Sequence, residues 1–274
     1  MIGGLEVGPI RVIAAKELRD RIRNRWVAAV SLVFTVFALV IAYFGPAQQG
    51  VIGFHGIGVT IASLVSLVIY LVPLIVLILG YDAIVGERER GSLDLLLSMP
   101  ITRLELLLGK FFGLSGALCV ATLTGFGLAG ALLAFQLDLP SLLRYLGFVL
   151  SALLMGMAFL SMALTVSVIA RDRARAGGLA VAVWFFFVLV YDLMLLSALV
   201  LTGGGPTGDL VAYLLLLNPA DTFRILNIFG IEEVRTLYGL ATVIPEPMAN
   251  PWFLGAFMLA STAGTLGFAA WRFK

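Results

Sequence analysis

Long apolar segments dominate the pattern of hydrophobic and polar positions along the chain. A helix needs about 20 apolar residues to cross a bilayer core of roughly 30 Å. Asp192 is the only charged residue within the segments that reach or approach this length. Because a chain in lipid must pair its backbone polar groups within each segment, we expect six membrane-spanning α-helices. The six segments are 27–44, 59–80, 112–135, 145–170, 177–201 and 252–271.

The composition supports a membrane protein and excludes other classes. Hydrophobic residues make up 61% of the 274 residues and charged residues 12%, about half the share of roughly 25% in soluble domains. Disorder requires low hydrophobicity and high net charge, whereas the net charge here is +2. A disulfide scaffold is excluded because Cys119 is the only cysteine.

The distribution of basic residues predicts the orientation in the membrane. Fifteen of the 18 Lys and Arg residues fall before the first segment, between the second and third, between the fourth and fifth, or after the sixth. An excess of Lys and Arg marks the cytoplasmic side. We therefore expect an all-α integral membrane protein with six spans and with both termini in the cytoplasm.

Residues 1–26 are expected to precede the six-helix domain at 27–274 as a separate cytoplasmic unit. Within them, 9–26 carries apolar residues at every fourth position and predicts an amphipathic helix along the membrane face. Its basic side chains favour a surface anchor on anionic lipid, and the alternative is a docking surface for a cytoplasmic partner. The candidate contact residues are Arg11, Lys16, Arg19 and Arg23.

The segment 82–105 carries more structure than a simple turn needs. Ser92 can cap a short helix that Pro100 ends, and the leucines of this helix share one face. Thr102 and Glu105 have the spacing of a capping box at the start of the third spanning helix. The alternatives are an ordinary turn with solvated charges and a rigid protrusion that contacts another protein.

The stretch 86–100 reads Gly-Glu-Arg-Glu-Arg-Gly-Ser-Leu-Asp-Leu-Leu-Leu-Ser-Met-Pro. It resembles the cytoplasmic signature of ABC-2 type permeases, the membrane subunits of ATP-binding-cassette systems. The resemblance implies a multi-pass protein of the bacterial inner membrane, in which two copies each dock on a cytoplasmic ABC ATPase subunit. It also implies that 9–26 is the interface helix and that 82–105 couples to the ATPase. The implied coupling residues are Glu87, Arg88, Glu89, Arg90, Gly91, Ser92, Leu93, Asp94, Leu96 and Leu97.

Three further stretches narrow the resemblance within that family. They lie at 23–26, 80–87 and 214–227, and they resemble the permeases of nitrous oxide reductase maturation systems. This narrower resemblance implies a periplasmic partner, a β-helical copper-handling protein. It also implies a role in the maturation of the copper sites of nitrous oxide reductase.

The sequence carries no nucleotide site. A P-loop needs Ser or Thr after its Gly-Lys pair, whereas Phe111 follows Gly109 and Lys110, the only such pair. We therefore expect a chain that is not itself an enzyme, with ATP and Mg²⁺ bound by the partner ATPase. We expect no metal site, because neither Cys119 nor His55 has a second ligand beside it. Membrane lipid is an expected partner and nucleic acid is not.

The segment 202–251 follows the fifth span and is expected on the periplasmic side. It begins with a glycine-rich break and continues with apolar positions at helical spacing. The alternatives are helices packed on the bundle and a docking platform for a periplasmic protein. The candidate docking residues are Phe223, Leu226, Phe229, Leu237 and Tyr238.

Asp192 is the one ionisable residue within a span, and such residues face the protein interior. Its carboxyl group can hydrogen-bond across a helix interface when protonated, or it can contact a substrate. An ion-coupled secondary transporter would need several such groups. That class is one alternative function, and an ABC-2 exporter of an unrelated small molecule or lipid is another.

Overall fold

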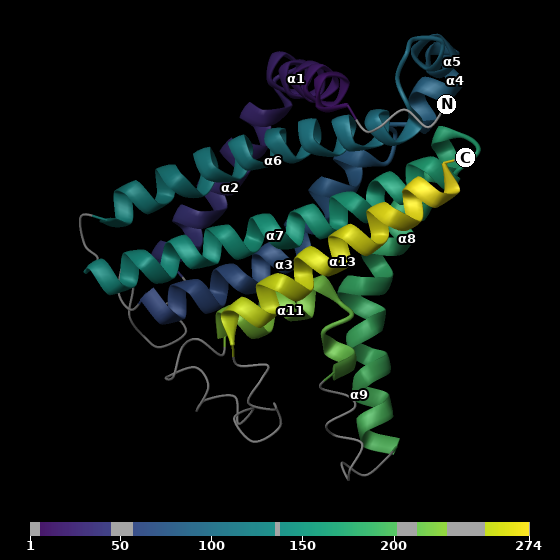
Figure 1. Ribbon diagram of the computed structural model, residues 1–274. Coiled ribbons are helices and arrows are strands. Elements are labelled where there is room, and N and C mark those ends of the chain that lie inside the picture. The colour runs from purple at the N-terminus through teal and green to yellow at the C-terminus, as the bar shows by residue number, and fades with distance from the viewer. Residues whose placement is uncertain (1–5, 45–56, 135–137, 202–212, 229–249, 274) are drawn as a thin grey trace.

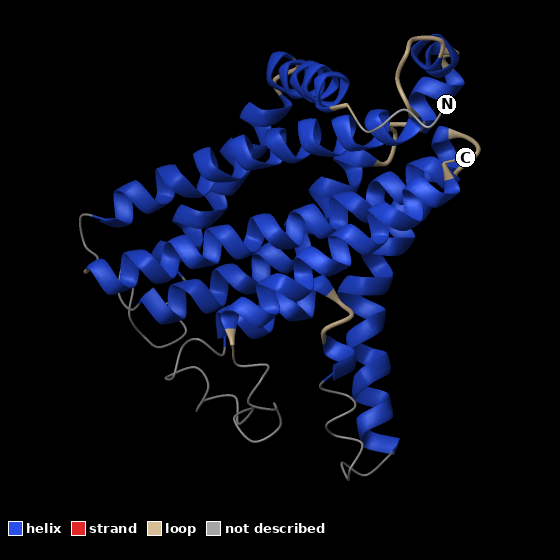
Figure 2. Cartoon of the chain, in the orientation of Figure 1, coloured by secondary structure: helices blue, strands red, loops and turns tan. Residues whose placement is uncertain are grey.

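The computed structural model describes residues 6–44, 57–134, 138–201, 213–228 and 250–273. Within these ranges every regular element is a helix (Figure 2). In chain order the elements are α1 (Val7–Arg23), α2 (Trp26–Phe44), α3 (Ile57–Gly80), α4 (Val85–Glu89), α5 (Ser92–Leu97), α6 (Arg103–Ala134), α7 (Leu139–Ile169), α8 (Arg173–Phe185), the π-helical turn η2 (Phe186–Val190), α9 (Tyr191–Leu201), α11 (Pro219–Ile228) and α13 (Pro251–Arg272).

Among the described residues, six helices are long and apolar enough to cross a membrane, as the sequence predicts. They are α2, α3, α6, α7, the continuous helix α8–η2–α9, and α13. Helix α6 begins at Arg103, nine residues before its uncharged apolar stretch at 112, because the capping box predicted for its start is formed. The Thr102 backbone N donates to Glu105 Oε2 at 2.7 Å, and the Glu105 backbone N donates to Thr102 Oγ1 at 3.2 Å.

The long helices α3, α6, α7 and α13 run side by side, and their facing sides form the apolar core (Figure 1). Helix α1 lies across α6 at one end of the bundle, and α4 and α5 project beyond the bundle at that same end. The C-terminal end of α13 also lies there. Further along the bundle, α11 packs against α3 and α7, while α9 extends away from the other helices.

Two glycines of α6 allow α1 to approach closely. A Cβ atom at Gly113 would lie 2.6 Å from Glu17 Cβ and 2.7 Å from the Ala14 carbonyl oxygen, and one at Gly109 would lie 2.7 Å from Ile13 Cβ. Small residues at such crossings let two helix backbones pack directly against each other. Helix α1 is therefore held against the start of a spanning helix by steric fit as well as by charge.

Candidate functional site

A sharp reversal at Gly91 joins the two short helices α4 and α5. The Gly91 backbone has φ of +70°, a conformation that a side-chain-bearing residue adopts only at a cost. The prediction that Ser92 caps α5 is wrong, because Gly91 occupies the cap position and Ser92 already lies inside the helix. Ser92 Oγ instead donates to the Glu87 carbonyl oxygen at 3.2 Å, which ties α5 to α4.

Helix α4 is attached to the C-terminal end of α7 by side-chain hydrogen bonds. Ser167 Oγ accepts from the backbone N of Ile84 at 2.9 Å and of Val85 at 3.1 Å. The Arg88 guanidinium donates to the carbonyl oxygens of Ala170 at 2.8 Å and Val168 at 3.2 Å. The last carbonyl groups of a helix have no partner within it, so Arg88 satisfies them.

Two carboxylates attach the same segment to the beginning of α8. Glu89 Oε1 accepts from the Arg173 backbone N at 2.7 Å, an arrangement that the positive end of a helix dipole favours. Asp82 Oδ2 lies 2.6 Å from Arg173 Nη2. The segment is therefore attached to the turn that joins α7 to α8 as well as to the end of α7.

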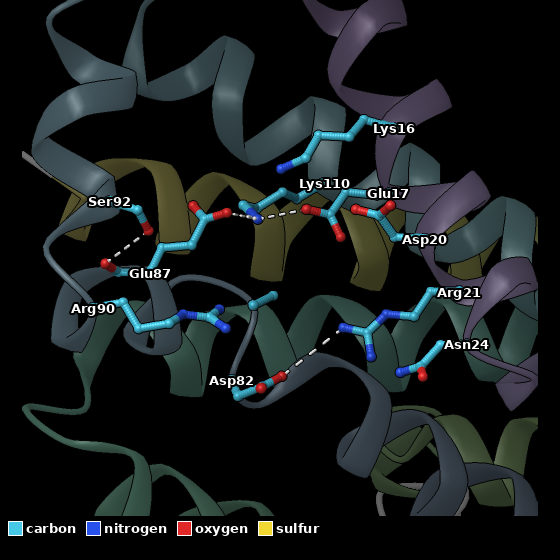
Figure 3. A pocket seen from close by; sticks show the side chains of 11 residues that line it. Lys16, Glu17, Asp20, Arg21, Asn24, Asp82, Glu87, Arg90, Ser92 and Lys110 are labelled. Atoms are coloured by element: carbon cyan, nitrogen blue, oxygen red, sulfur yellow. Dashed lines mark hydrogen bonds and ion pairs between the residues drawn. The ribbon is translucent and has the colours of Figure 1, made fainter.

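A buried lysine joins three separate helices. Lys110 Nζ of α6 lies 2.7 Å from Glu17 Oε1 of α1 and 2.8 Å from Glu87 Oε1 of α4 (Figure 3). Lys110 is 2% exposed, Glu87 7% and Glu17 8%. The second carboxylate oxygen of Glu87 is buried and has no hydrogen-bond partner. This Glu17–Lys110–Glu87 cluster joins the predicted interface helix to the predicted coupling segment through two buried ion pairs.

A polar cavity of about 330 Å³, lined in part by the cluster itself, lies between α1 on one side and α4 and α5 on the other (Figure 3). Charged side chains of both signs line it. Among them, Arg21 Nη2 of α1 lies 4.0 Å from Asp82 Oδ1, the widest ion pair of the site. Such a hollow separates two elements that are otherwise joined through Lys110.

The predicted coupling residues divide into buried anchors and an exposed surface. Glu87 and Leu93 are buried, and Leu96 and Leu97 are half-buried against the apolar core. The exposed residues of the set are Arg88, Glu89, Arg90, Gly91 and Asp94. Leu95 is not among the residues predicted from the sequence, yet it is 69% exposed on α5 and is the most exposed leucine of the segment.

On α1 the predicted basic residues are exposed, and the residue that anchors the helix is acidic. Arg11, Lys16, Arg19 and Arg23 are exposed, and Lys16 also lines the cavity beside Lys110. Glu17 is not among the residues predicted from the sequence, and Lys110 was expected only as one of the basic residues of a cytoplasmic loop. The available signal was a lysine between Gly109 and Gly113, inside an otherwise apolar helical stretch.

Of the remaining predicted site residues, Asp192 lies on α9, and Phe223 and Leu226 lie on α11. Asp192 is paired with Arg224, whose Nη1 lies 2.9 Å from Asp192 Oδ2. The prediction that Phe223 docks a partner is wrong, because its side chain is completely buried against Phe148. Leu226 is half-buried. The other predicted docking residues, Phe229, Leu237 and Tyr238, fall outside the described residues.

Within the described ranges, no three side chains of His, Cys, Asp or Glu come together as a metal site would require. His55 falls outside those ranges. The described site instead joins helices to one another through ion pairs and hydrogen bonds at one end of the bundle.

The charged end of this six-span bundle carries the arrangement of a transporter membrane subunit, and the chain belongs to the ABC-2 transporter family. A family model described as "ABC-2 family transporter protein" matches residues 11–274. The chain is 47% identical over 247 residues to a "Probable ABC transporter permease protein NosY" of Stutzerimonas stutzeri, covering 88% of this chain and 90% of that protein. It is 46% identical over 246 residues to the protein of the same description in Pseudomonas aeruginosa, with the same coverage. It is thus an ABC transporter permease subunit, a multi-pass protein of the bacterial inner membrane.

Proposed function

We propose that this permease converts the movement of a cytoplasmic ABC ATPase into a rearrangement on the periplasmic side. In this proposal α1, α4, α5 and both termini lie in the cytoplasm, as the distribution of basic residues predicts. The observation that carries the proposal is the Glu17–Lys110–Glu87 cluster, since it joins α1 and α4 to a spanning helix through one buried cation.

A force applied to α5 has two routes into the membrane. The first runs through α4 and Glu87 to Lys110, and so to α6. The second runs through Arg88 and Glu89 to the turn between α7 and α8. Because α6, α7 and the α8–η2–α9 helix all cross the membrane, displacement of the short helices tilts three spans together.

The ATPase contact is proposed on the exposed side of α5. Leu95 of α5 is 69% exposed, and Met99, just after the end of α5, is 54% exposed. Exposed apolar side chains beside charged ones are typical of a protein-binding surface. ATP and Mg²⁺ are bound by the partner in this proposal, because the only Gly-Lys pair of the chain has no P-loop around it.

A second copy of the chain and membrane lipid are proposed to cover the spanning helices. In the continuous helix from Arg173 to Ala198, only 11% of the most apolar 18-residue stretch is buried against the rest of the chain. Its apolar side chains therefore need cover other than water. Two copies would each engage one ATPase subunit.

We also propose a role in the copper-site maturation of nitrous oxide reductase, with a β-helical copper-handling protein as the periplasmic partner. The identity to two NosY permeases supports this assignment, and so do the three stretches that resemble such permeases. A strain that lacks this chain should make nitrous oxide reductase with incomplete copper sites, and the intact gene should restore the copper content. Full copper content in the deletion strain would instead favour an ABC-2 exporter of another small molecule or lipid.

The ATPase contact is tested by co-purification of the complex from membranes. Leu95→Asp should abolish co-elution of a P-loop ATPase, because it places a charge in the proposed apolar contact. Leu139→Asp is the matched control, since Leu139 is also 69% exposed but lies at the start of α7, away from α5. Equal recovery of the ATPase with both variants would contradict the proposed contact.

A further inference from the structure

A second charge cluster lies where the π-helical turn η2 passes into α9. Arg224 Nη1 of α11 lies 2.6 Å from Asp221 Oδ1 and 2.9 Å from Asp192 Oδ2. Two carboxyl groups from separate helices therefore meet at a single guanidinium nitrogen. Asp221 is 1% exposed, and the side chains of Asp192 and Arg224 are about one third exposed.

The cluster holds one more acid than base. Tyr191, which lies beside it, donates its hydroxyl to the Leu214 carbonyl oxygen at 2.6 Å and adds no charge. The other titratable side chains on the described helices that pack against α11 and η2 form no hydrogen bond or ion pair with either carboxyl group. They are Tyr70 of α3, Arg144 and Tyr145 of α7, Arg173 and Arg175 of α8, and Arg272 of α13.

Three of the four carboxyl oxygens accept a hydrogen bond. Asp221 Oδ2 accepts from Asn218 Nδ2 at 2.7 Å, and Arg224 serves Asp221 Oδ1 and Asp192 Oδ2. The fourth oxygen, Asp192 Oδ1, is buried and has no partner. With both acids ionised, an uncompensated negative charge would remain in this apolar region, a costly state that binding of a proton removes.

We propose that Asp192 and Asp221 share one proton, so that the Asp192–Arg224–Asp221 cluster is a proton-binding site within the bundle. Two carboxyl groups that meet at one cation titrate as a pair, and the proton belongs to the pair rather than to one residue. Burial raises the pKa of the Asp221 carboxyl to about 7, against the lowering effect of Arg224 and with a further raising effect from Asp192.

The position of the site gives the proton a structural consequence. Asn218 Nδ2, which bonds Asp221, also donates to the Phe187 carbonyl oxygen of η2 at 2.8 Å. A π-helical turn disturbs the regular backbone hydrogen bonds of a helix and occurs frequently at functional sites. The same polar network therefore joins the start of α11, the π-helical turn η2 and the start of α9. Loss of the proton leaves two like charges across the α9–α11 junction and loosens it.

The proton is detected directly by infrared difference spectroscopy of the full chain in lipid nanodiscs. Wild-type protein should show the carbonyl band of a protonated carboxyl group, which disappears as the pH rises through neutrality from about 5 to about 8. Asp192→Asn and Asp221→Asn should each remove this titrating band, whereas Asp138→Asn, at the N-terminus of α7, should retain it. The absence of the band in wild type, or its persistence in both cluster variants, would overturn the proposal.

A second measurement uses thermal unfolding. Between the ordinary pKa of an aspartate and the raised value, the folded state holds more protons than the unfolded state, so stability falls as the pH rises toward neutrality. The unfolding midpoint of wild type should fall by about 3 °C from about pH 6 to about pH 8. Asp192→Asn, which mimics the neutral carboxyl group, should show no such fall. An identical fall in that variant would contradict a shared proton; if the variant does not fold, the wild-type infrared titration decides alone.

Discussion

Lys110 Nζ lies 2.8 Å from Glu87 Oε1 although the two residues belong to separate helices and both are almost completely excluded from solvent. The same ammonium group lies 2.7 Å from Glu17 Oε1 of a third helix. An intact buried ion pair adds little net stability, because removing charges from water is costly. Loss of one partner, in contrast, leaves the others buried without compensation. The arrangement of α1, α4 and α6 therefore depends on all three charged side chains being present.

Lys110→Met tests this dependence. The side chain keeps its length but loses its charge, so two buried carboxylates remain unpaired. We expect a loss of about 3–5 kcal/mol in the free energy of unfolding, measured as a lower thermal unfolding midpoint of the purified protein. Lys16→Met is the control, because Lys16 is exposed and should change stability by no more than about 0.5 kcal/mol. Equal midpoints for the two variants would show that the buried pairs do not hold the helices together.

Two glycines of α6 provide a matched test of the contact between α1 and α6. A Cβ atom at Gly113 would meet the backbone of α1 at 2.7 Å, whereas at Gly127 nothing lies within 4 Å. Gly113→Ala should therefore lower the free energy of unfolding by about 1–3 kcal/mol through overpacking. Gly127→Ala should be neutral or should stabilise α6 by up to about 1 kcal/mol, since alanine favours a helix.

The sign of the difference between these variants is the decisive result. It is measured by thermal unfolding of both proteins in the same detergent. If Gly113→Ala were as stable as Gly127→Ala, α1 would have to shift away from α6 without loss. The close approach would then not be needed for the fold.

The six spans were predictable from the sequence because the thickness of the bilayer fixes the length of an apolar segment. The start of α6 was predictable in kind, since Thr102 and Glu105 form the expected capping box. The π-helical turn η2 was not predictable. A run of five apolar residues, 186–190, carries no signal that separates a π-turn from an α-helix. Its partner Asn218 is 31 residues away along the chain from Phe187.

The candidate site was only partly predictable, because some of its contacts join residues that are far apart in the sequence. The run from Gly86 to Pro100 is continuous in sequence, so local patterns identified it. Glu17 and Lys110 are 93 residues apart, and only the packing of α1 across α6 brings them together. The basic side chains of α1 dominate its sequence but are mostly exposed, whereas the buried acid Glu17 contacts the spanning helix α6.

Arg88→Lys tests the attachment of α4 to α7. The planar guanidinium reaches two carbonyl oxygens, those of Ala170 and Val168, and a lysine ammonium on a shorter and differently shaped side chain cannot serve both in the same way. Because Arg88 is exposed, we expect a modest loss of about 1 kcal/mol in thermal unfolding experiments. Arg19→Lys is the control, since Arg19 is exposed and makes no hydrogen bond or ion pair in the described structure. A larger loss in the control than in Arg88→Lys would argue against this attachment.

Glu87→Gln tests the coupling route through Lys110 with little change in shape. The amide can still contact Lys110, but it carries no charge, so the tie between α4 and α6 weakens while Glu17 keeps Lys110 paired. Membrane insertion should be unchanged, because the apolar spans are intact. In the assembled complex, the ATPase rate should no longer respond to binding of the periplasmic partner, and the ratio of the rates with and without that partner should fall toward one. Asp94→Asn, an exposed position of α5, should keep the wild-type ratio. A wild-type ratio in Glu87→Gln together with normal assembly would mean that movement reaches the membrane by way of α7 and α8 instead.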